Sequence, residues 1–300
     1  DQARDHFVAA GESGDYVLLL DPLAVPIDLD GDGKARPGET LAVLTRRAEE
    51  IIAPYDYDPV EEKRRSKGVT LDSSVGFDRA DAFWFAGYTQ VAAAPVDWLL
   101  AHDFSTFYAV ALHTVFPAAG LPMEDYVRGQ GTLFEDPQSD RGIADMIAGI
   151  HMARFPVSDG ERLGGVLERL RSITSFSRQN WDAILAETDD TRELVPSPAQ
   201  TSIIADMTVS EEMVAAWRAT LDTLDTILAG DLLVPHWRFS RGFDLALYFE
   251  TSTETDPILI LSGYGALPFL RDGPIADADD FAQGNRVFGD AWPQYLFWFN

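Results

Sequence analysis

The chain has 300 residues, of which 49 are acidic and 23 are basic, so its formal net charge is −26. Such a charge repels phosphate backbones and anionic lipid surfaces, which argues against nucleic-acid binding and against electrostatic docking to membranes. The hydrophobic content of 46% is normal for a globular protein and is sufficient for a sizeable core. Cysteine is absent, which excludes disulfides, thiolate metal sites and cysteine nucleophiles.

The chain begins DQARDHF without a methionine, as a mature protein does once its signal peptide is removed. No stretch approaches the roughly eighteen uninterrupted apolar residues of a membrane helix. The longest apolar-rich segment, 82–101, carries Gln90, Pro95 and Asp97. We therefore expect a buried core helix there and no membrane insertion.

The first quarter of the chain alternates apolar and acidic segments. Residues 15–27 are apolar but contain two prolines, which predicts an extended conformation. After an acidic stretch at 28–39, the pattern over 39–52 predicts a helix with one apolar side, formed by Leu41, Leu44, Ala48 and Ile51. Segment 53–76 is polar and charged, and it predicts a mobile surface loop that is open to proteolysis.

The middle of the chain reads as helices separated by short breaks. Residues 77–117 predict two helical pieces with a junction at 101–106. Segment 118–139 is rich in glycine and proline and is predicted to be a loop. Asp140 is predicted to cap a short helix, and Asp159 to start a longer one.

The clearest helix is predicted over 208–231. Thr208 and Glu211 have the spacing of a capping box, and Gly230 is a plausible C-cap. A single apolar stripe runs along this segment, formed by Val214, Trp217, Leu221, Leu224 and Leu228.

Beyond it, 232–240 and 243–250 alternate like strands and predict a hairpin across Arg241-Gly242. The Asp-Pro pair at 256–257 predicts the start of another helix. The C-terminal YLFWFN is apolar and is expected to dock into the core.

One short stretch, DLDGDGKARPGE at 28–39, carries a chemical signal. Its acids stand at positions 1, 3, 5 and 12 of the loop, with glycine at position 6. Calcium takes six to eight oxygen ligands, and this spacing turns a short loop so that its acids converge on one point. The alternative is a solvated acidic turn, since aspartate and glycine both favour turns.

This stretch resembles the EF-hand calcium loop, whose pattern D-x-[DN]-x-[DN]-G-x5-E it matches in full. The resemblance implies a calcium ion held by side chains and by one backbone carbonyl, with Arg36 where water usually bridges. The implied ligands are Asp28, Asp30, Asp32, the carbonyl of Lys34, and Glu39.

The resemblance covers only these twelve residues, and the chain departs from the family around them. Pro22 and Pro26 argue against an incoming helix, and no second loop exists to form a pair. Ala35 and Pro37 also differ from the usual residues. These departures argue against a calmodulin-like switch and suit the solitary, dockerin-like loops of secreted proteins, in which calcium is a structural clip.

Other chemistry is not evident from the sequence. The five histidines, His6, His102, His113, His151 and His236, form no compact metal pattern, and His102 and His113 are expected to be hydrogen-bonded core residues. The segment PHWRF at 235–239 could line a pocket, although a strand with His and Trp on opposite faces is the plainer interpretation. No nucleophile elbow, P-loop or dinucleotide fingerprint occurs.

The sequence thus predicts a mainly α protein, with 1–300 forming a single helical domain that has a minor β-hairpin and one solitary calcium loop. We expect a non-catalytic binding or scaffolding protein of the periplasm or cell exterior, clipped by Ca2+, with a protein or glycan partner. One alternative is a calcium-stabilised hydrolase, of glycans or of another substrate, whose catalytic acids the sequence does not identify. The other is a calcium-responsive sensor.

Overall fold

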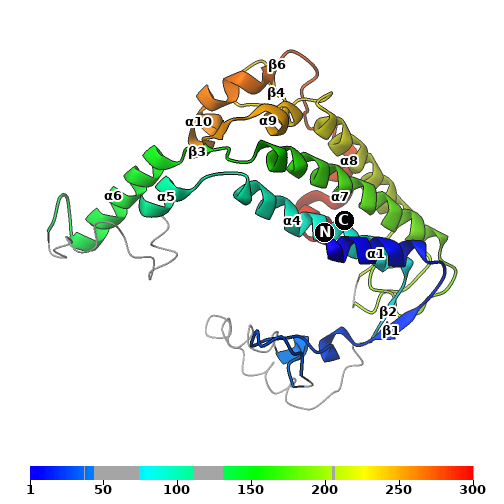
Figure 1. Ribbon diagram of the computed structural model, residues 1–300. Helices are drawn as coiled ribbons and strands as arrows, with labels where there is room; N and C mark the ends of the chain where they lie inside the picture. Colours follow the sequence, from blue (N-terminus) through cyan, green and yellow to red (C-terminus); the bar gives the residue numbers. More distant parts are fainter. Residues whose placement is uncertain (37, 44–73, 111–130, 205–206, 300) are drawn as a thin grey trace. The chain divides into compact units, whose positions relative to one another are not determined.

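A computed structural model describes residues 1–36, 38–43, 74–110, 131–204 and 207–299 (Figure 1). Helices predominate among these residues, which confirms the mainly α prediction. The helices are α1 (Gln2–Glu12), α4 (Arg79–Leu100), α5 (Ser105–Val110), α6 (Pro137–Met152), α7 (Gly160–Ala186), α8 (Glu211–Ala229), α9 (Leu245–Thr251), α10 (Pro257–Ser262), α11 (Ala282–Phe288) and α12 (Trp292–Phe299).

Short 3-10 helices and two-stranded sheets complete the described structure. The 3-10 helices are η1 (Pro22–Ala24), η5 (Tyr264–Phe269) and η6 (Gly289–Ala291). All three sheets are antiparallel, and they pair β1 (Leu18–Leu20) with β2 (Val75–Phe77), β3 (Phe155–Pro156) with β5 (Glu254–Thr255), and β4 (Gly242–Phe243) with β6 (Leu270–Arg271).

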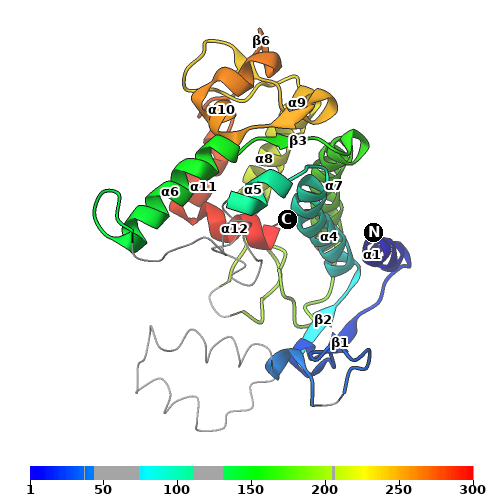
Figure 2. The same ribbon diagram turned by 60° about the vertical axis from the view of Figure 1, so that its left-hand side comes forward.

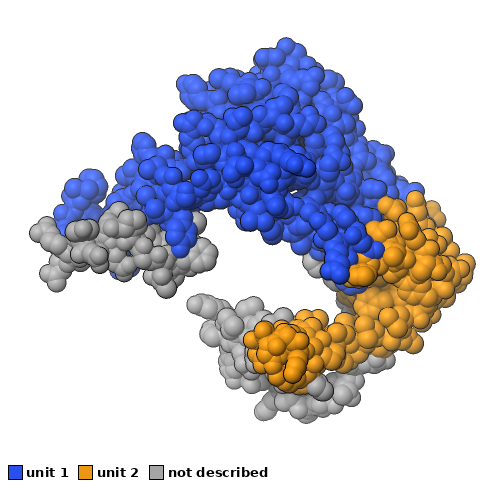
Figure 3. All heavy atoms as spheres, viewed as in Figure 1, with its two compact units in different colours: residues 1–5, 84–178, 212–300 blue, residues 6–83, 179–211 orange. Residues whose placement is uncertain are grey.

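The chain divides into two compact units, coloured separately in Figure 3. The first unit comprises residues 1–5, 84–178 and 212–300, and the second comprises 6–83 and 179–211. That 1–300 folds as a single domain stays a prediction. No helix in the described ranges is long and apolar enough to cross a bilayer.

The core of the first unit lies where α4, α7 and α8 meet the C-terminal third of the chain. Its apolar members are Ala94, Ala101, Leu163, Val166, Leu167, Leu228, Ala246, Tyr248, Phe249 and Phe269. The leucines and valine of α7 recur at helical spacing, so one face of the helix is buried. The carboxylate of Asp97 on α4 also binds Arg162 and Arg169 of α7, at 2.5 Å each, which places the two helices side by side (Figure 2).

Helix α8 and the C-terminus pack as the sequence predicts. The side chain of Trp217 is buried on α8, and its indole N–H donates to the Ser177 hydroxyl at 2.9 Å. That hydroxyl donates to the carbonyl of Phe299, which is itself fully buried. The docking of the C-terminal aromatic segment is therefore confirmed, and Gly230 takes the left-handed φ of 81° expected of a C-cap.

The junction between α4 and α5 also lies where predicted. Asp103 accepts a hydrogen bond from the Ser105 N–H and caps α5. His102 is buried, and its ring nitrogens contact the Trp98 carbonyl at 2.6 Å and the Thr255 hydroxyl at 2.8 Å. It is the hydrogen-bonded core histidine that we expected.

Three local predictions were wrong. Helix α8 begins at Glu211, so Thr208 is not its N-cap residue as the capping-box spacing predicted. Helix α6 is capped by Asp136, four residues before Asp140, because Pro137 suits the first helical position. The Asp140 carboxylate instead accepts the N–H groups of residues 133–135 and ties the preceding turn to the helix. In the predicted hairpin only Val234 and Phe243 pair. The second strand is helix α9, because Asp244 caps it through the Leu247 N–H and Ala246, Tyr248 and Phe249 bury one helical face.

The predicted helix after Asp256 is confirmed as α10, with Asp256 as N-cap and Pro257 at its first position. Strand β1 lies in the segment 15–27 that was predicted to be extended, whereas helix α1 and the other strands of the small sheets were not predicted. The expected helix over 39–52 is helical at 41–43 but not at 39–40. Residues 44–52 lie outside the described residues, as do most of the loop at 53–76, part of that at 118–139, and His113.

Candidate metal-binding sites

The acidic loop at 28–39 is closed at its base by backbone contacts. The Ile27 N–H donates to the Glu39 carbonyl at 2.7 Å, and Pro26 bridges to Thr40 beside it. The entering chain is the 3-10 turn η1 followed by an extended segment, so the incoming helix of an EF-hand is replaced, as the prolines predicted. The residues at the beginning and the end of the loop therefore lie next to each other in the second unit.

Asp28 organises the turn of the loop. Its carboxylate accepts the N–H groups of Gly31 at 2.8 Å, Asp32 at 3.2 Å and Gly33 at 2.8 Å. The two glycines have φ of 76° and 85°, which side-chain-bearing residues rarely adopt. These contacts bend the chain around Asp28 and turn the later acids back toward it.

Three of the predicted ligands are brought together. Carboxylate oxygens of Asp28, Asp30 and Asp32 lie within 4.8 Å of one another and are exposed to solvent. Glu39 is not part of this group, and no contact places the Lys34 carbonyl in it. The three aspartates can present oxygens to one hard cation.

Arg36 contacts the acids of the same loop. Its guanidinium pairs with Asp30 at 3.1 Å, with Glu39 at 3.4 Å and with Asp32. The Arg36 N–H also donates to the Glu39 carboxylate at 3.1 Å. Arg36, which the sequence placed at a water-bridged position, is therefore the hub of the ion pairs in the loop.

A second acidic cluster, which the sequence did not reveal, lies in the same unit. Carboxylate oxygens of Asp78, Glu187 and Glu193 lie within 4.8 Å of one another. Asp78 and Glu193 are buried, with 8% and 5% of their surfaces exposed, and one oxygen of Glu187 is buried without a hydrogen-bond partner in the described structure. We call Asp78, Asp81, Glu187 and Glu193 the buried carboxyl cluster.

Three chain segments assemble this cluster. Asp78 caps α4 through the Ala80 N–H, and Asp81 in the first turn accepts the Asp78 N–H at 3.1 Å. Glu187 follows the end of α7. Glu193 arrives from a loop that pairs with β2, where Gly76 donates to the Arg192 carbonyl at 3.1 Å. A Cβ at Gly76 would lie 2.0 Å from the Thr191 carbonyl oxygen, so only glycine permits this close approach.

Burial and mutual repulsion hold protons on the cluster. Burial, with the charge of Asp78, raises the pKa of Asp81 to about 7 and that of Glu193 to about 7. Burial and the neighbouring Asp78 carboxyl also raise the pKa of Glu187 well above its ordinary value. Asp81, Glu187 and Glu193 can therefore hold protons near neutral pH, or would give them up to a bound cation.

The comparisons with known proteins give no further guide. No family model, curated protein or solved structure matches this chain. The geometry of the two clusters is therefore the evidence for their chemistry.

A local sequence pattern marks one part of the buried carboxyl cluster. Asp78-Arg-Ala-Asp81 has the spacing of a capping box before an apolar helix. As in a capping box, the carboxylate of Asp81 accepts the N–H of Asp78. Glu187 and Glu193 lie more than a hundred residues further along the chain, and no local pattern predicts that they return to this cap.

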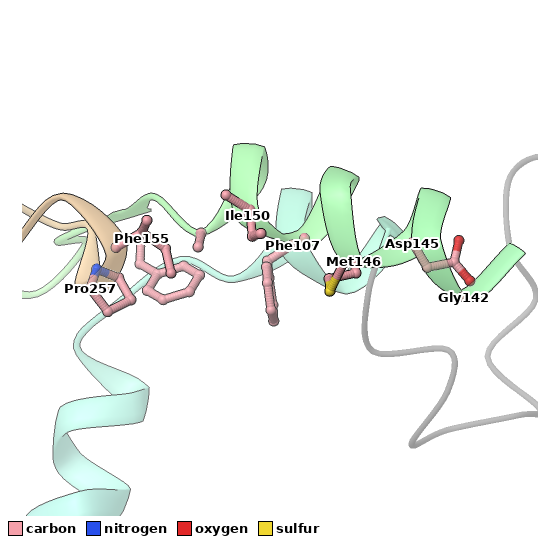
Figure 4. A pocket seen from close by; sticks show the side chains of 10 residues that line it. Phe107, Gly142, Asp145, Met146, Ile150, Phe155 and Pro257 are labelled. Atoms are coloured by element: carbon pink, nitrogen blue, oxygen red, sulfur yellow. The ribbon is translucent and has the colours of Figure 1, made fainter. Parts of the chain in front are cut away.

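An apolar pocket of about 500 Å³ lies in the first unit, between α5, α6 and the start of α10 (Figure 4). Phe107, Met146, Ile150 and Phe155 line it, and Asp145 is its one acid. A single carboxyl group among the lining residues offers no acid–base pair. We therefore assign this pocket no chemistry.

The segment PHWRF forms a turn rather than a strand. His236, Trp237 and Arg238 each bind one of the last carbonyls of α10, at Ile260, Leu261 and Ser262. The last carbonyls of a helix have no donor four residues further along the helix, although that of Ile260 also accepts the Gly263 N–H at 3.1 Å. The segment thus adds side-chain donors to the end of α10, and Trp237 remains 75% exposed.

Proposed function

We propose that this protein binds calcium in the loop at 28–39 and that the ion is a structural clip of a non-catalytic binding or scaffolding protein. The ligands are Asp28, Asp30, Asp32, the Lys34 carbonyl and Glu39. The observation that carries the proposal is the convergence of three aspartate carboxylates within 4.8 Å in a loop that backbone contacts close. A solvated turn does not require this convergence of like charges, whose mutual repulsion the guanidinium of Arg36 offsets in part.

Calcium suits this loop better than magnesium. The carboxylates are exposed and are supplied by a flexible turn, whereas magnesium demands near-ideal octahedral geometry and keeps its water. Glu39 reaches the same ion by rotating its side chain toward the three aspartates. The exiting chain then joins the base of the loop, so that the bound ion ties residues 27 and 40 together.

A clip of this kind has a consequence for location. A site that remains filled without paired loops needs calcium near millimolar concentration, which exists outside the cytoplasm. The proposed compartment is therefore the periplasm or the cell exterior. The partner is a protein or a glycan, because the net charge of −26 repels nucleic acid.

Glu39→Gln tests the ligand assignment. The change removes one charge and the bidentate carboxylate and keeps the size of the side chain, so we expect calcium affinity to fall at least roughly tenfold. Isothermal titration of the wild type and the variant measures the change. Glu12→Gln, an exposed acid outside the loop, is the matched control. An isotherm that Glu39→Gln leaves unchanged rejects the assignment.

A second candidate function, a calcium-stabilised hydrolase, is favoured by one observation. The buried carboxyl cluster borders a cavity of about 340 Å³ lined by Asp78 and Glu187, and a carboxyl with a raised pKa can act as a general acid. This candidate requires that the wild type hydrolyse at least one substrate of a glycoside panel and that Glu187→Gln abolish the turnover. Inactivity of the wild type across the panel rejects it.

A further inference from the structure

The loop divides its carboxylate oxygens between two tasks. One oxygen of Asp30 accepts the Asp32 N–H at 3.1 Å, and one oxygen of Asp32 accepts the Lys34 N–H at 2.9 Å. The other oxygen of each aspartate contacts the guanidinium of Arg36. The oxygens that the backbone leaves free are therefore the ones that Arg36 binds.

Glu39 also contacts Arg36, but in this residue a single oxygen serves both tasks. Its Oε2 accepts both the N–H and the side chain of Arg36, at 3.1 Å and 3.4 Å. Asp28 differs, because its two oxygens accept only backbone N–H groups. The turn thus depends on Asp28 and the backbone, whereas Arg36 contacts the three remaining acids without shaping the turn.

We propose that Arg36 is an internal competitor of calcium, a tethered cation that binds the same three carboxylates and so sets the affinity of the site. This inference rests on the proposed function of the loop. A calcium ion takes the oxygens of Asp30, Asp32 and Glu39 that the guanidinium contacts only when the guanidinium leaves them. The cost of breaking these contacts is subtracted from the binding free energy.

The competition has a direction and a size. Exposed ion pairs stabilise by a fraction of a kcal/mol each, and a network of three is stronger than an isolated pair. Removing the guanidinium should therefore raise calcium affinity by roughly tenfold. The same removal should weaken the loop in chelator, because four acids then face one another with less compensation.

The chain supplies a matched control two residues away. Lys34 carries the same charge in the same loop, but its ammonium contacts none of the described acids. Lys34→Gln and Arg36→Gln change the net charge equally. Lys34→Gln keeps the backbone carbonyl, which is the only atom of this residue proposed as a ligand, and only Arg36→Gln removes the contacts with the acids. The difference in calcium affinity between the two variants therefore separates the competition by Arg36 from the effect of net charge.

The experiment is a calcium titration of the wild type, Arg36→Gln and Lys34→Gln by isothermal calorimetry, at low ionic strength. We expect Arg36→Gln to bind roughly tenfold more tightly than the wild type, and Lys34→Gln less than about threefold more tightly. Equal gains in the two variants, or no gain in Arg36→Gln while the wild type binds, overturn the inference and leave the calcium site intact. Absence of binding in all three chains overturns the proposed function and the inference together.

Discussion

At pH 8, in chelator, the protein is expected to be less stable than at pH 5 by on the order of 2 kcal/mol. The cause is the buried carboxyl cluster. Burial and mutual repulsion raise the pKa of Asp81 and Glu193 to about 7, and raise that of Glu187 as well. In the unfolded chain these groups ionise near roughly pH 4.

The sign follows from proton binding. Between roughly pH 4 and pH 7 the folded chain holds more protons than the unfolded chain, so its stability falls as pH rises through this range. Below roughly pH 4 both states are protonated, and the stabilisation by the cluster is fully present. The loss continues above pH 7 until Glu187 has also ionised in the folded state.

Glu193→Gln separates this effect from other titrations. The amide keeps the size of the side chain, and its oxygen can still accept the Thr191 N–H that Glu193 binds at 2.9 Å. We expect the variant to be more stable than the wild type at pH 8 and similar at pH 5, by urea unfolding in chelator. Glu12→Gln is the exposed control. A wild-type stability that is flat or rises from pH 5 to pH 8 contradicts the assignment.

Asp28→Ala is expected to remove calcium binding, with a loss of affinity of at least roughly a hundredfold. The substitution deletes a ligand, and it also leaves the N–H groups of Gly31 and Gly33 without their acceptor, while the Asp32 N–H keeps only Asp30. In chelator we also expect the free energy of unfolding to fall by about 1–2 kcal/mol, because the turn around Asp28 is no longer held.

Asp30→Ala is the matched comparison for this prediction. It also deletes one ligand of the group and one contact of Arg36, but the only backbone N–H affected is that of Asp32, which keeps Asp28 as an acceptor. Calcium titration and urea unfolding in chelator should therefore show weakened binding in both variants, with the larger loss of stability in Asp28→Ala. Calcium affinity in Asp28→Ala equal to that of the wild type would exclude the loop as the site.

Much of the fold could be predicted because it is encoded locally. The apolar stripe of α8, the Asp159 start of α7 and the Asp256-Pro257 start of α10 each combine a helical period with a capping residue. Local signals failed where two were in competition. Asp136, followed by Pro137, is the N-cap of α6 in place of Asp140. The segment that alternates like a strand forms α9, because Asp244 caps it and one helical face is buried.

The two acidic clusters show the same limit. The acids at 28–39 are adjacent in sequence, so their spacing alone predicted that Asp28, Asp30 and Asp32 converge. The ion pairs of Arg36 depend on side-chain reach, which the spacing of a motif does not describe. The buried carboxyl cluster joins residues more than a hundred positions apart, through a loop that packs on Gly76, and local periodicity contains no information about that contact.

The most direct test of the calcium clip is thermal unfolding of the wild type in 1 mM calcium, in 1 mM magnesium and in chelator, with analysis of bound metal. If calcium binds at roughly 10 μM, linkage predicts about 2.7 kcal/mol of stabilisation, or a rise in Tm of about 5 °C, with one calcium per chain. Magnesium should produce a much smaller rise. Equal Tm values in all three conditions, with no calcium bound, would contradict the account.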